Sequence, residues 1–137
     1  GYSTFARPNN SARQCVLVID DESAVREAVT DILGMHEIEV ITAENGQAGI
    51  DLYSQHRNDV QLVILDMSMP GLNGVETLAR LRQIDPDVPV ILSSGYSQQQ
   101  IADEVKVNGH TGFLPKPYDL HTLVSKVWQF LPGTPEP

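Results

Sequence analysis

The chain has 137 residues, of which 41% are apolar and 20% are charged. This length and composition favour one globular domain over a disordered segment. Its formal net charge of −9 argues against direct binding to the phosphate backbone of nucleic acids. The single cysteine, Cys15, cannot form an internal disulfide, which fits a reducing compartment. No apolar stretch approaches the roughly 20 residues that cross a bilayer, and no signal-peptide pattern is present. We therefore expect a cytoplasmic domain that does not insert into a membrane.

The two ends differ in composition from the middle of the chain. Residues 1–13 are polar and show no helical or strand periodicity, so we interpret them as a linker. The proline-rich residues 132–137 are interpreted as a C-terminal tail. Between them, residues 14–131 alternate short apolar runs with helical patterns, which is typical of strand–helix units around a parallel sheet.

Five apolar runs are predicted to be the strands of this sheet. Helices cover both faces of such a sheet, so each strand should be apolar and buried on both sides. The predicted strands are Cys15–Ile19, Glu39–Thr42, Leu62–Leu65, Val90–Leu92 and Gly112–Leu114.

Helical spacing of apolar residues predicts a first helix that ends at Gly34 and a last helix that ends at Pro132 and Gly133. The two stripes consist of Val25, Ala28, Val29, Ile32 and Leu33, and of Leu120, Val124, Val127 and Leu131. The second helix, around 46–56, is weaker because Gly49 costs about 1 kcal/mol in a helix interior. The fourth, around 98–107, begins with three glutamines, and we expect it to be the most mobile.

Polar residues follow four of the predicted strands. In an open parallel sheet, the ligand site lies beyond the carboxyl ends of the strands. Asp20 and Asp21 follow the first strand, Asp66 the third, Ser94 the fourth and Lys116 the fifth. We expect these side chains to converge at one edge of the sheet.

Three neighbouring carboxylates repel one another, so they need a shared proton or a divalent cation. An all-oxygen ligand set favours Mg²⁺. A carboxylate is also a competent nucleophile toward phosphorus, and cations stabilise the transferring phosphoryl group. We therefore predict that Asp66 accepts a phosphoryl group, that Lys116 and Mg²⁺ supply positive charge, and that Ser94 donates a hydrogen bond to a phosphoryl oxygen.

Each of these residues also has a purely structural interpretation. Asp20 and Asp21 could cap a helix and supply its first-turn acid. Asp66 could begin a turn, Ser94 could cap the fourth helix, and Lys116 could be a solvated surface lysine. Their joint occurrence at successive strand ends favours the functional interpretation.

The ordered set resembles the receiver domains of two-component response regulators over about residues 14–131. It consists of Asp20-Asp21, Asp66 with Met69-Pro70 and Gly74, Ser94-Gly95, and Lys116-Pro117. The resemblance implies a flavodoxin-like (βα)5 three-layer α/β sandwich with a parallel five-stranded sheet of order 2-1-3-4-5.

The resemblance also implies a role for each matched residue. Asp66 would be the phosphoacceptor, acting with Ser94 and Lys116 as the catalytic residues. Asp20, Asp21, Asp66 and the backbone carbonyl of Ser68 would bind Mg²⁺. Ser94 and Phe113 would form the switch, and the peptide bond before Pro117 would be cis. Here Ser94 replaces the commoner Thr, and Phe113 lacks the hydroxyl of the Tyr found in many relatives.

The implied phosphodonor is a histidine kinase or a histidine phosphotransfer domain. The domain would assist its own phosphorylation and dephosphorylation without being an enzyme that turns over a separate substrate. Its output would be a changed surface of the fourth helix, fifth strand and fifth helix, which could also serve for dimerisation. We further expect Tyr96 to shield the acyl phosphate from water, since Tyr96 and Ser68 flank the route of attack.

Residues 92–97 resemble receivers at the C-terminus of hybrid sensor histidine kinases, so we expect that context, with a free-standing response regulator as the alternative. A receiver that binds partners without phosphorylation is another alternative. A Mg²⁺-dependent aspartyl-nucleophile phosphatase is disfavoured because Asp66 is followed by Met67-Ser68. A flavin-binding domain is disfavoured by the acidic loop after the first strand. The four histidines are too scattered for a metal site.

Overall fold

The computed structural model describes residues 14–69, 73–105 and 107–131. The predicted linker and tail, Pro70 of the sequence motif, and the helix stop at Pro132 and Gly133 lie outside the described residues. Among the described helices, none combines the length and apolarity needed to cross a bilayer.

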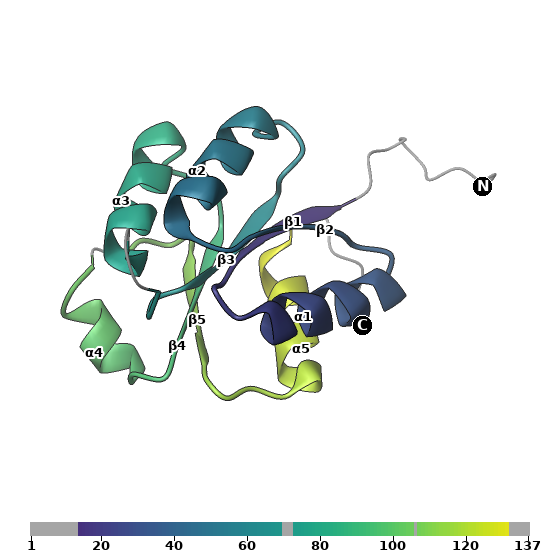
Figure 1. Ribbon diagram of the computed structural model, residues 1–137. Helices are drawn as coiled ribbons and strands as arrows, with labels where there is room; N and C mark the ends of the chain where they lie inside the picture. Colours follow the sequence, from purple (N-terminus) through teal and green to yellow (C-terminus); the bar gives the residue numbers. More distant parts are fainter. Residues whose placement is uncertain (1–13, 70–72, 106, 132–137) are drawn as a thin grey trace.

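The described residues form five strands that alternate with five helices, and the parallel sheet has the order β2-β1-β3-β4-β5 (Figure 1). This order confirms the expected flavodoxin-like fold. The strands are β1 (Cys15–Ile19), β2 (Glu39–Ala43), β3 (Leu62–Asp66), β4 (Val90–Ser94) and β5 (Thr111–Pro115). The helices are α1 (Ser23–Met35), α2 (Gly46–Gln55), α3 (Gly74–Ile84), α4 (Gln98–Ala102) and α5 (Leu120–Phe130).

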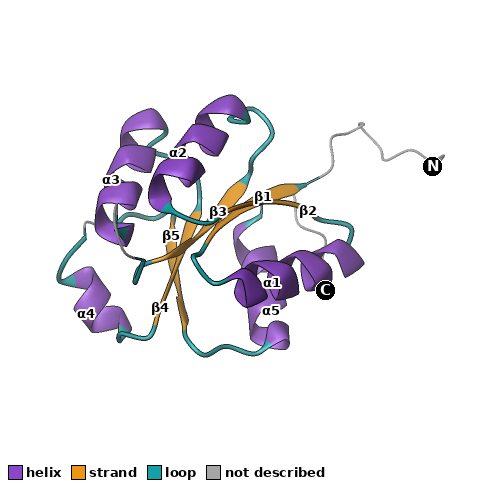
Figure 2. Cartoon of the chain, in the orientation of Figure 1, coloured by secondary structure: helices purple, strands orange, loops and turns teal. Residues whose placement is uncertain are grey.

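Two helix layers enclose the sheet, with α1 and α5 on one face and α2, α3 and α4 on the other (Figure 2). Alternate residues of β1 pack into different apolar clusters: Val16 and Val18 join α1 and α5, whereas Leu17 and Ile19 join the opposite layer. This division follows from the two-residue period of a strand, which sends successive side chains to opposite faces.

The three central strands, β1, β3 and β4, are buried throughout, as predicted. The prediction was wrong for β2, in which only Ala43 is buried, and β5 also has partly exposed positions. Both are edge strands with a single neighbour in the sheet, so the helices and adjacent strands cover them less completely.

The prediction that Gly34 ends the first helix was wrong, because α1 continues to Met35. The chain leaves the helix at Glu37, whose φ of 63° is in the left-handed region. The Glu37 amide donates to the Gly34 carbonyl and the Ile38 amide to the Leu33 carbonyl, a pattern that satisfies the last carbonyls of a helix.

Helix α4 is shorter than the predicted 98–107, ending at Ala102. A capping box fixes its first turn, because the Ser97 hydroxyl accepts from the Gln100 amide and the Gln100 side chain accepts from the Ser97 amide. Ile101 is its one buried side chain. The expected mobility of this helix remains a prediction.

Gly49 lets α2 lie close to β1. A Cβ atom at this position would be 2.4 Å from Cδ1 of Ile19, far inside van der Waals contact. The residue that weakens the helix pattern in the sequence therefore permits the packing of α2 against β1, next to the position of Asp20.

Candidate functional site

The polar residues predicted at the strand ends do meet at the carboxyl edge of the sheet. Asp20 directly follows β1, Asp66 ends β3, Ser94 ends β4 and Lys116 follows β5. Because β1, β3, β4 and β5 are consecutive neighbours in the sheet, residues far apart in the chain come together. Lys116 Nζ lies 3.1 Å from Asp20 Oδ2 and 3.5 Å from Asp66 Oδ2.

The acidic cluster consists of Asp20, Asp21 and Asp66, which each offer a carboxylate oxygen within 4.8 Å of the others. Asp20 and Asp66 are 3% and 2% exposed, whereas Asp21 is exposed to solvent. The donor set contains only oxygen atoms and is open to water on the side of Asp21. Such a set fits Mg²⁺, which retains several waters and needs few protein carboxylates.

Asp20 is held by contacts at both its carboxylate and its backbone. Its Oδ1 accepts from the Glu22 amide at 2.9 Å, and its Oδ2 accepts from Lys116. Its backbone carbonyl accepts from Arg26 at 2.8 Å, and its amide donates to the Ala43 carbonyl. These bonds fix the turn between β1 and α1 that carries two of the three acids.

Asp66 is fixed by its own turn and by the start of α3. Its Oδ1 accepts from the Ser68 amide at 2.9 Å, while its Oδ2 faces Lys116. A Cβ atom at Gly74 would lie 2.5 Å from Met67 Cα and 3.0 Å from the Asp66 carbonyl oxygen. Only glycine therefore allows α3 to begin this close behind the acid, which explains its place in the sequence motif.

Among the residues that the structure describes, Lys116 supplies the positively charged side chain that contacts the buried carboxylates of Asp20 and Asp66. Burial lowers the pKa of its ammonium, but the hydrogen bond to Asp20 and the charges of Asp20, Asp66 and Glu22 outweigh that effect. The net result is a pKa above the ordinary value of 10.5. The Lys116 amide donates to the Ser94 carbonyl, and the peptide bond to Pro117 is cis, as expected.

Glu22 is a residue that the sequence analysis missed. Its Oε1 lies 3.8 Å from Lys116 Nζ, although its side chain is 63% exposed. The signal available in the sequence was its position directly after Asp20 and Asp21. Three acidic side chains, those of Asp20, Glu22 and Asp66, therefore contact one lysine at this edge of the sheet.

Ser94 is buried, and its hydroxyl oxygen accepts from the Tyr96 amide at 2.9 Å. In this conformation the hydroxyl forms a local turn.

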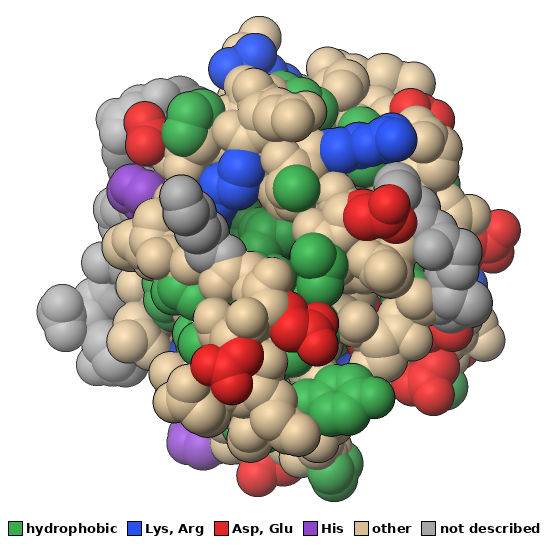
Figure 3. Space-filling model, turned by 90° about the vertical axis from the view of Figure 1, so that its left-hand side faces the viewer, with side chains coloured by type: hydrophobic (Ala, Val, Ile, Leu, Met, Phe, Trp, Pro, Cys, Tyr) green, Lys and Arg blue, Asp and Glu red, His purple; other side chains and the backbone are tan. Residues whose placement is uncertain are grey.

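Phe113 is partly buried and packs against the apolar cluster that includes Ile101 of α4. Tyr96 is 59% exposed. Viewed from the side of α3 and α4, the surface shows hydrophobic side chains between acidic ones (Figure 3).

A groove of about 410 Å³ adjoins the site between α1 and the segment that joins β5 to α5. Glu22, Lys116 and Tyr118 line it together with apolar residues that include Val25 and Leu120. Burial, followed by the charge of Asp20, raises the pKa of the Tyr118 hydroxyl. The groove thus combines an apolar wall with two charged side chains, Glu22 and Lys116, that lie beside the acidic cluster.

Among the residues that the structure describes, no histidine belongs to the acidic cluster. His110 pairs with Asp87 at 3.6 Å, and the His36 ring meets the edge or face of Trp128 with centroids 6.3 Å apart. Both contacts lie outside the site.

Fold and site define an open parallel α/β domain whose acidic cluster and lysine meet at the carboxyl edge of its sheet. The family model of the response regulator receiver domain matches residues 16–128. The chain belongs to this family.

The chain is 30% identical over 117 residues to sporulation initiation phosphotransferase F of Bacillus subtilis, covering 85% of this chain and 93% of that protein. It is 31% identical over 121 residues to the sensor kinase CckA of Brucella abortus, covering 88% of this chain but 13% of that protein. Among solved structures, it resembles the response regulator TrrA of Thermotoga maritima in complex with Mg(2+)-BeF, with 30% identity and a TM-score of 0.70 over 86% of this chain and 99% of that one.

Proposed function

We propose that this receiver domain accepts a phosphoryl group on Asp66 from a histidine kinase or a histidine phosphotransfer domain and that Mg²⁺ is its cofactor. The observation that carries the proposal is the buried Asp66 carboxylate, which lies 3.5 Å from Lys116 Nζ within a cluster of three carboxylates. Phosphoryl transfer needs this combination of a positioned nucleophile and nearby positive charge.

In the transfer step, a carboxylate oxygen of Asp66 attacks the phosphorus of a phosphohistidine. The new O–P bond forms as the N–P bond breaks, and a phosphoimidazolium ring leaves as neutral imidazole, so charge and protons balance. The Lys116 ammonium stabilises the negative charge of the phosphoryl oxygens. Mg²⁺, held by Asp20, Asp21, Asp66 and the Ser68 carbonyl, would supply further positive charge there. The complex of TrrA with Mg(2+)-BeF supports this cofactor.

The groove between α1 and the β5–α5 segment is the proposed docking place of the phosphodonor. Two of its lining residues, Glu22 and Lys116, also contact each other beside the acids. A partner whose apolar side chains pack against Val25 and Leu120 would therefore bring its phosphohistidine next to Asp66.

Phosphorylation would act through Ser94 and Phe113. The Ser94 hydroxyl would leave the Tyr96 amide and donate to a phosphoryl oxygen, since the phosphoryl group offers three strong acceptors. Phe113 shares its apolar cluster with Ile101, so a rotation of Phe113 would change the packing of α4. The phosphoryl group thereby shifts a two-state equilibrium by contacts made in one state only.

We further propose a cytoplasmic domain of a hybrid sensor histidine kinase. Its similarity to part of CckA supports this context. Its similarity to nearly the full length of sporulation initiation phosphotransferase F supports the alternative, a free-standing response regulator. Under either alternative, the domain turns over no substrate other than its own acyl phosphate.

The test is incubation with acetyl phosphate and Mg²⁺, followed by intact-mass measurement. The parent should gain one phosphoryl group, and Asp66→Ala should gain none. Asp51→Ala, which removes an acid from the exposed side of α2, is the matched control and should behave as the parent. Chelation of Mg²⁺ should prevent the modification. A phosphorylated Asp66→Ala variant would contradict the proposal.

A further inference from the structure

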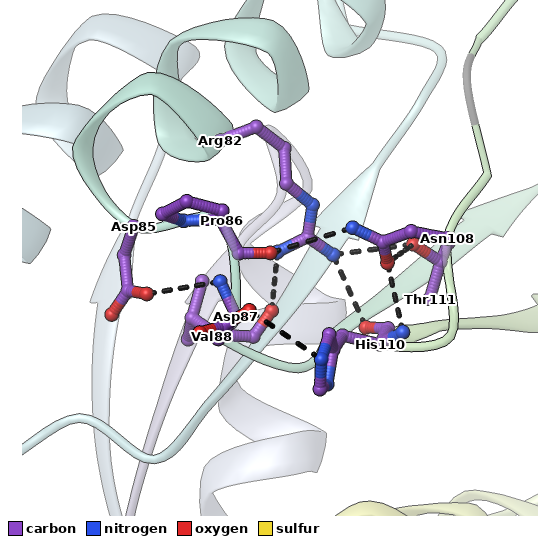
Figure 4. A network of polar contacts seen from close by, with 8 residues as sticks. All are labelled: Arg82, Asp85, Pro86, Asp87, Val88, Asn108, His110 and Thr111. Atoms are coloured by element: carbon purple, nitrogen blue, oxygen red, sulfur yellow. Dashed lines mark hydrogen bonds and ion pairs between the residues drawn. The ribbon is translucent and has the colours of Figure 1, made fainter.

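A second polar network lies at the amino end of the β4–β5 pair, and the proposed reaction does not use it (Figure 4). Arg82, in the last turn of α3, donates hydrogen bonds to the carbonyl oxygens of Pro86 and Val88, which precede β4. Its other terminal nitrogen donates to the His110 carbonyl at 3.1 Å and to Oγ1 of Thr111 at 3.2 Å. One half-buried guanidinium therefore joins the segments that lead into β4 and β5.

Asn108 reinforces this connection. Its side-chain nitrogen Nδ2 donates to the Pro86 carbonyl. Its Oδ1 accepts from the backbone amide of His110 at 2.8 Å and from the Thr111 hydroxyl at 3.1 Å. His110 adds an exposed pair with Asp87. We call Arg82, Asn108 and the groups that they contact the Arg82 network. It holds the residues before β5 against the residues before β4.

The chain between Ser94 and Asn108 is thus fixed at both ends. At the carboxyl edge, the Ser94 hydroxyl holds the Tyr96 amide, and at the amino edge, the Arg82 network holds residues 108–111. Between these ends, Ile101 is the one buried side chain of α4, and Val105 is only partly buried. The segment from Gly95 to Val105 therefore has few buried side chains that must repack when the Ser94 loop moves.

We propose that the Arg82 network is a fixed anchor that confines the phosphorylation-induced change of the backbone to residues 95–105 and so directs it to α4, whose Ile101 shares an apolar cluster with the Phe113 side chain. Arg82 is then a positioning residue of the switch, far along the strands from the reacting atoms. Without the Arg82 network, a shift of the Ser94 loop would also displace residues 108–111 at the start of β5, and α4 would move less. Charged donors to several carbonyl oxygens are among the stronger hydrogen bonds, which suits an anchor. This inference rests on the proposed function.

The test compares amide hydrogen exchange with and without beryllofluoride and Mg²⁺ in the parent, Arg82→Met and Arg80→Met. Arg80 lies on the same helix, is exposed and has a 3.3 Å contact with Gln47, so its variant is the matched control. In the parent, beryllofluoride should change exchange within 95–105 and leave 108–112 unchanged.

Arg82→Met should bind beryllofluoride with an affinity within about twofold of the parent, since Arg82 does not contact the acidic cluster. Amides 108–112 should exchange about tenfold faster, a factor that corresponds to roughly one net hydrogen bond. The beryllofluoride response should extend into 108–112 and weaken within 95–105. Arg82→Lys, which keeps the charge but not the forked geometry, should be intermediate. Arg80→Met should match the parent.

A beryllofluoride response that stays confined to 95–105 in Arg82→Met would overturn the inference, as would an equal loss of confinement in Arg80→Met. If Arg82→Met does not fold, Asn108→Ala replaces it, because Asn108 is exposed and its removal leaves Arg82 in place. It should show the same spreading to a smaller extent, and no spreading would count against the anchor. A parent that does not bind beryllofluoride would instead refute the proposed function.

Discussion

The two ends of the sheet treat charge in opposite ways. At the carboxyl end, three acidic side chains contact Lys116, Asp21 lies beside them, and two of the acids are almost fully buried. At the amino end of β4 and β5, the guanidinium of Arg82 is matched by backbone carbonyls and a hydroxyl of the same chain. The first end carries an excess of negative charge that a bound cation would compensate, whereas the polar groups of the second end are paired within the chain.

The two ends therefore affect the stability of the fold differently. Buried like charges oppose folding unless a counter-ion compensates them, so the acidic cluster lowers stability in the absence of a bound cation. Side-chain donors that satisfy backbone carbonyls favour one arrangement of the loops. Variants at the carboxyl end should therefore respond to Mg²⁺, and variants at the amino end should not.

The largest expected effect comes from Lys116→Met, which leaves buried carboxylates without their cation. Removal of one partner of a buried ion pair costs about 3–5 kcal/mol, and since water reaches this site we expect a loss of about 2–4 kcal/mol in the free energy of unfolding. Urea denaturation without Mg²⁺ measures it, with Lys126→Met of α5 as the control. Equal stability of parent and Lys116→Met would show that the acids are neutralised in another way.

The same pair of proteins tests a pH dependence. The pKa of Lys116 is raised in the folded chain, so its stabilising contribution is complete below the unfolded-state value near 10.5 and is lost as the pH rises through the folded-state value. The stability difference between parent and Lys116→Met should accordingly narrow above pH 10.5.

The same substitution at two helical glycines should have opposite signs. Gly49→Ala places a Cβ against Ile19, next to Asp20, and should cost about 1–3 kcal/mol by overpacking. Gly34→Ala, at the amino end of the sheet, meets nothing within 4 Å and should gain up to about 1 kcal/mol through helix propensity. Denaturation curves of both variants measure the effect. If the Ile19 side chain can move aside, Gly49→Ala should be stabilised as well, and the two signs would agree.

Mg²⁺ should stabilise the parent by about 1.4 kcal/mol at ten times its dissociation constant, because it binds only the folded site. Asp21→Asn removes the exposed ligand and should lose most of this gain, while Glu27→Gln on α1 should keep it. Thermal unfolding at increasing Mg²⁺ concentration measures the effect. A gain that survives in Asp21→Asn would exclude Asp21 as a ligand.

A smaller effect is expected at the amino end from Tyr53→Phe, which removes the 2.9 Å hydrogen bond from the buried Tyr53 hydroxyl to Asp85. The expected cost is about 0.5–1.5 kcal/mol, unchanged by Mg²⁺. A double-mutant cycle with Asp85→Asn isolates the contact. A cost that varied with Mg²⁺ would break the contrast between the two ends.

The acid side of this contact has its own pH dependence. Burial raises the pKa of Asp85, but the Asp87 amide, the Tyr53 hydroxyl and neighbouring arginines lower it further, so the net shift is downward from 3.8. A lowered pKa gives a contribution that is present above the unfolded-state value and is lost as the pH falls through the folded-state value. The penalty of Tyr53→Phe should therefore shrink in acid.

The smallest effect is expected for Tyr96→Ala. Because the ring is 59% exposed, it would shield the acyl phosphate only partly, and its loss should speed hydrolysis about two- to threefold, or ~0.5 kcal/mol of barrier. Tyr96→Phe keeps the ring and should match the parent. Loss of phosphate is followed by intact mass, and an unchanged rate in Tyr96→Ala would remove the shielding role.

The features that depend on burial or on order along the chain were predictable from the sequence. The central strands β1, β3 and β4 are apolar because both faces are covered, and the acids and Lys116 stand directly after strands whose carboxyl ends share one edge. The apolar pattern of β2 did not reveal its exposure, because that pattern is local; the edge position of the strand follows from the strand order, which came from the resemblance. The length of α4 was also overestimated, since few apolar residues set its limits.

The sequence by itself determined that a parallel sheet would form and that three acids and a lysine would meet at its carboxyl edge, because strand periodicity and strand direction are local properties that place those side chains. Only the tertiary structure decided that Glu22 reaches Lys116, that Gly49 lets α2 pack against Ile19, and that Arg82 reaches His110, 28 residues further along the chain. Such contacts depend on distances between separately packed elements, and no local pattern of residues records those distances.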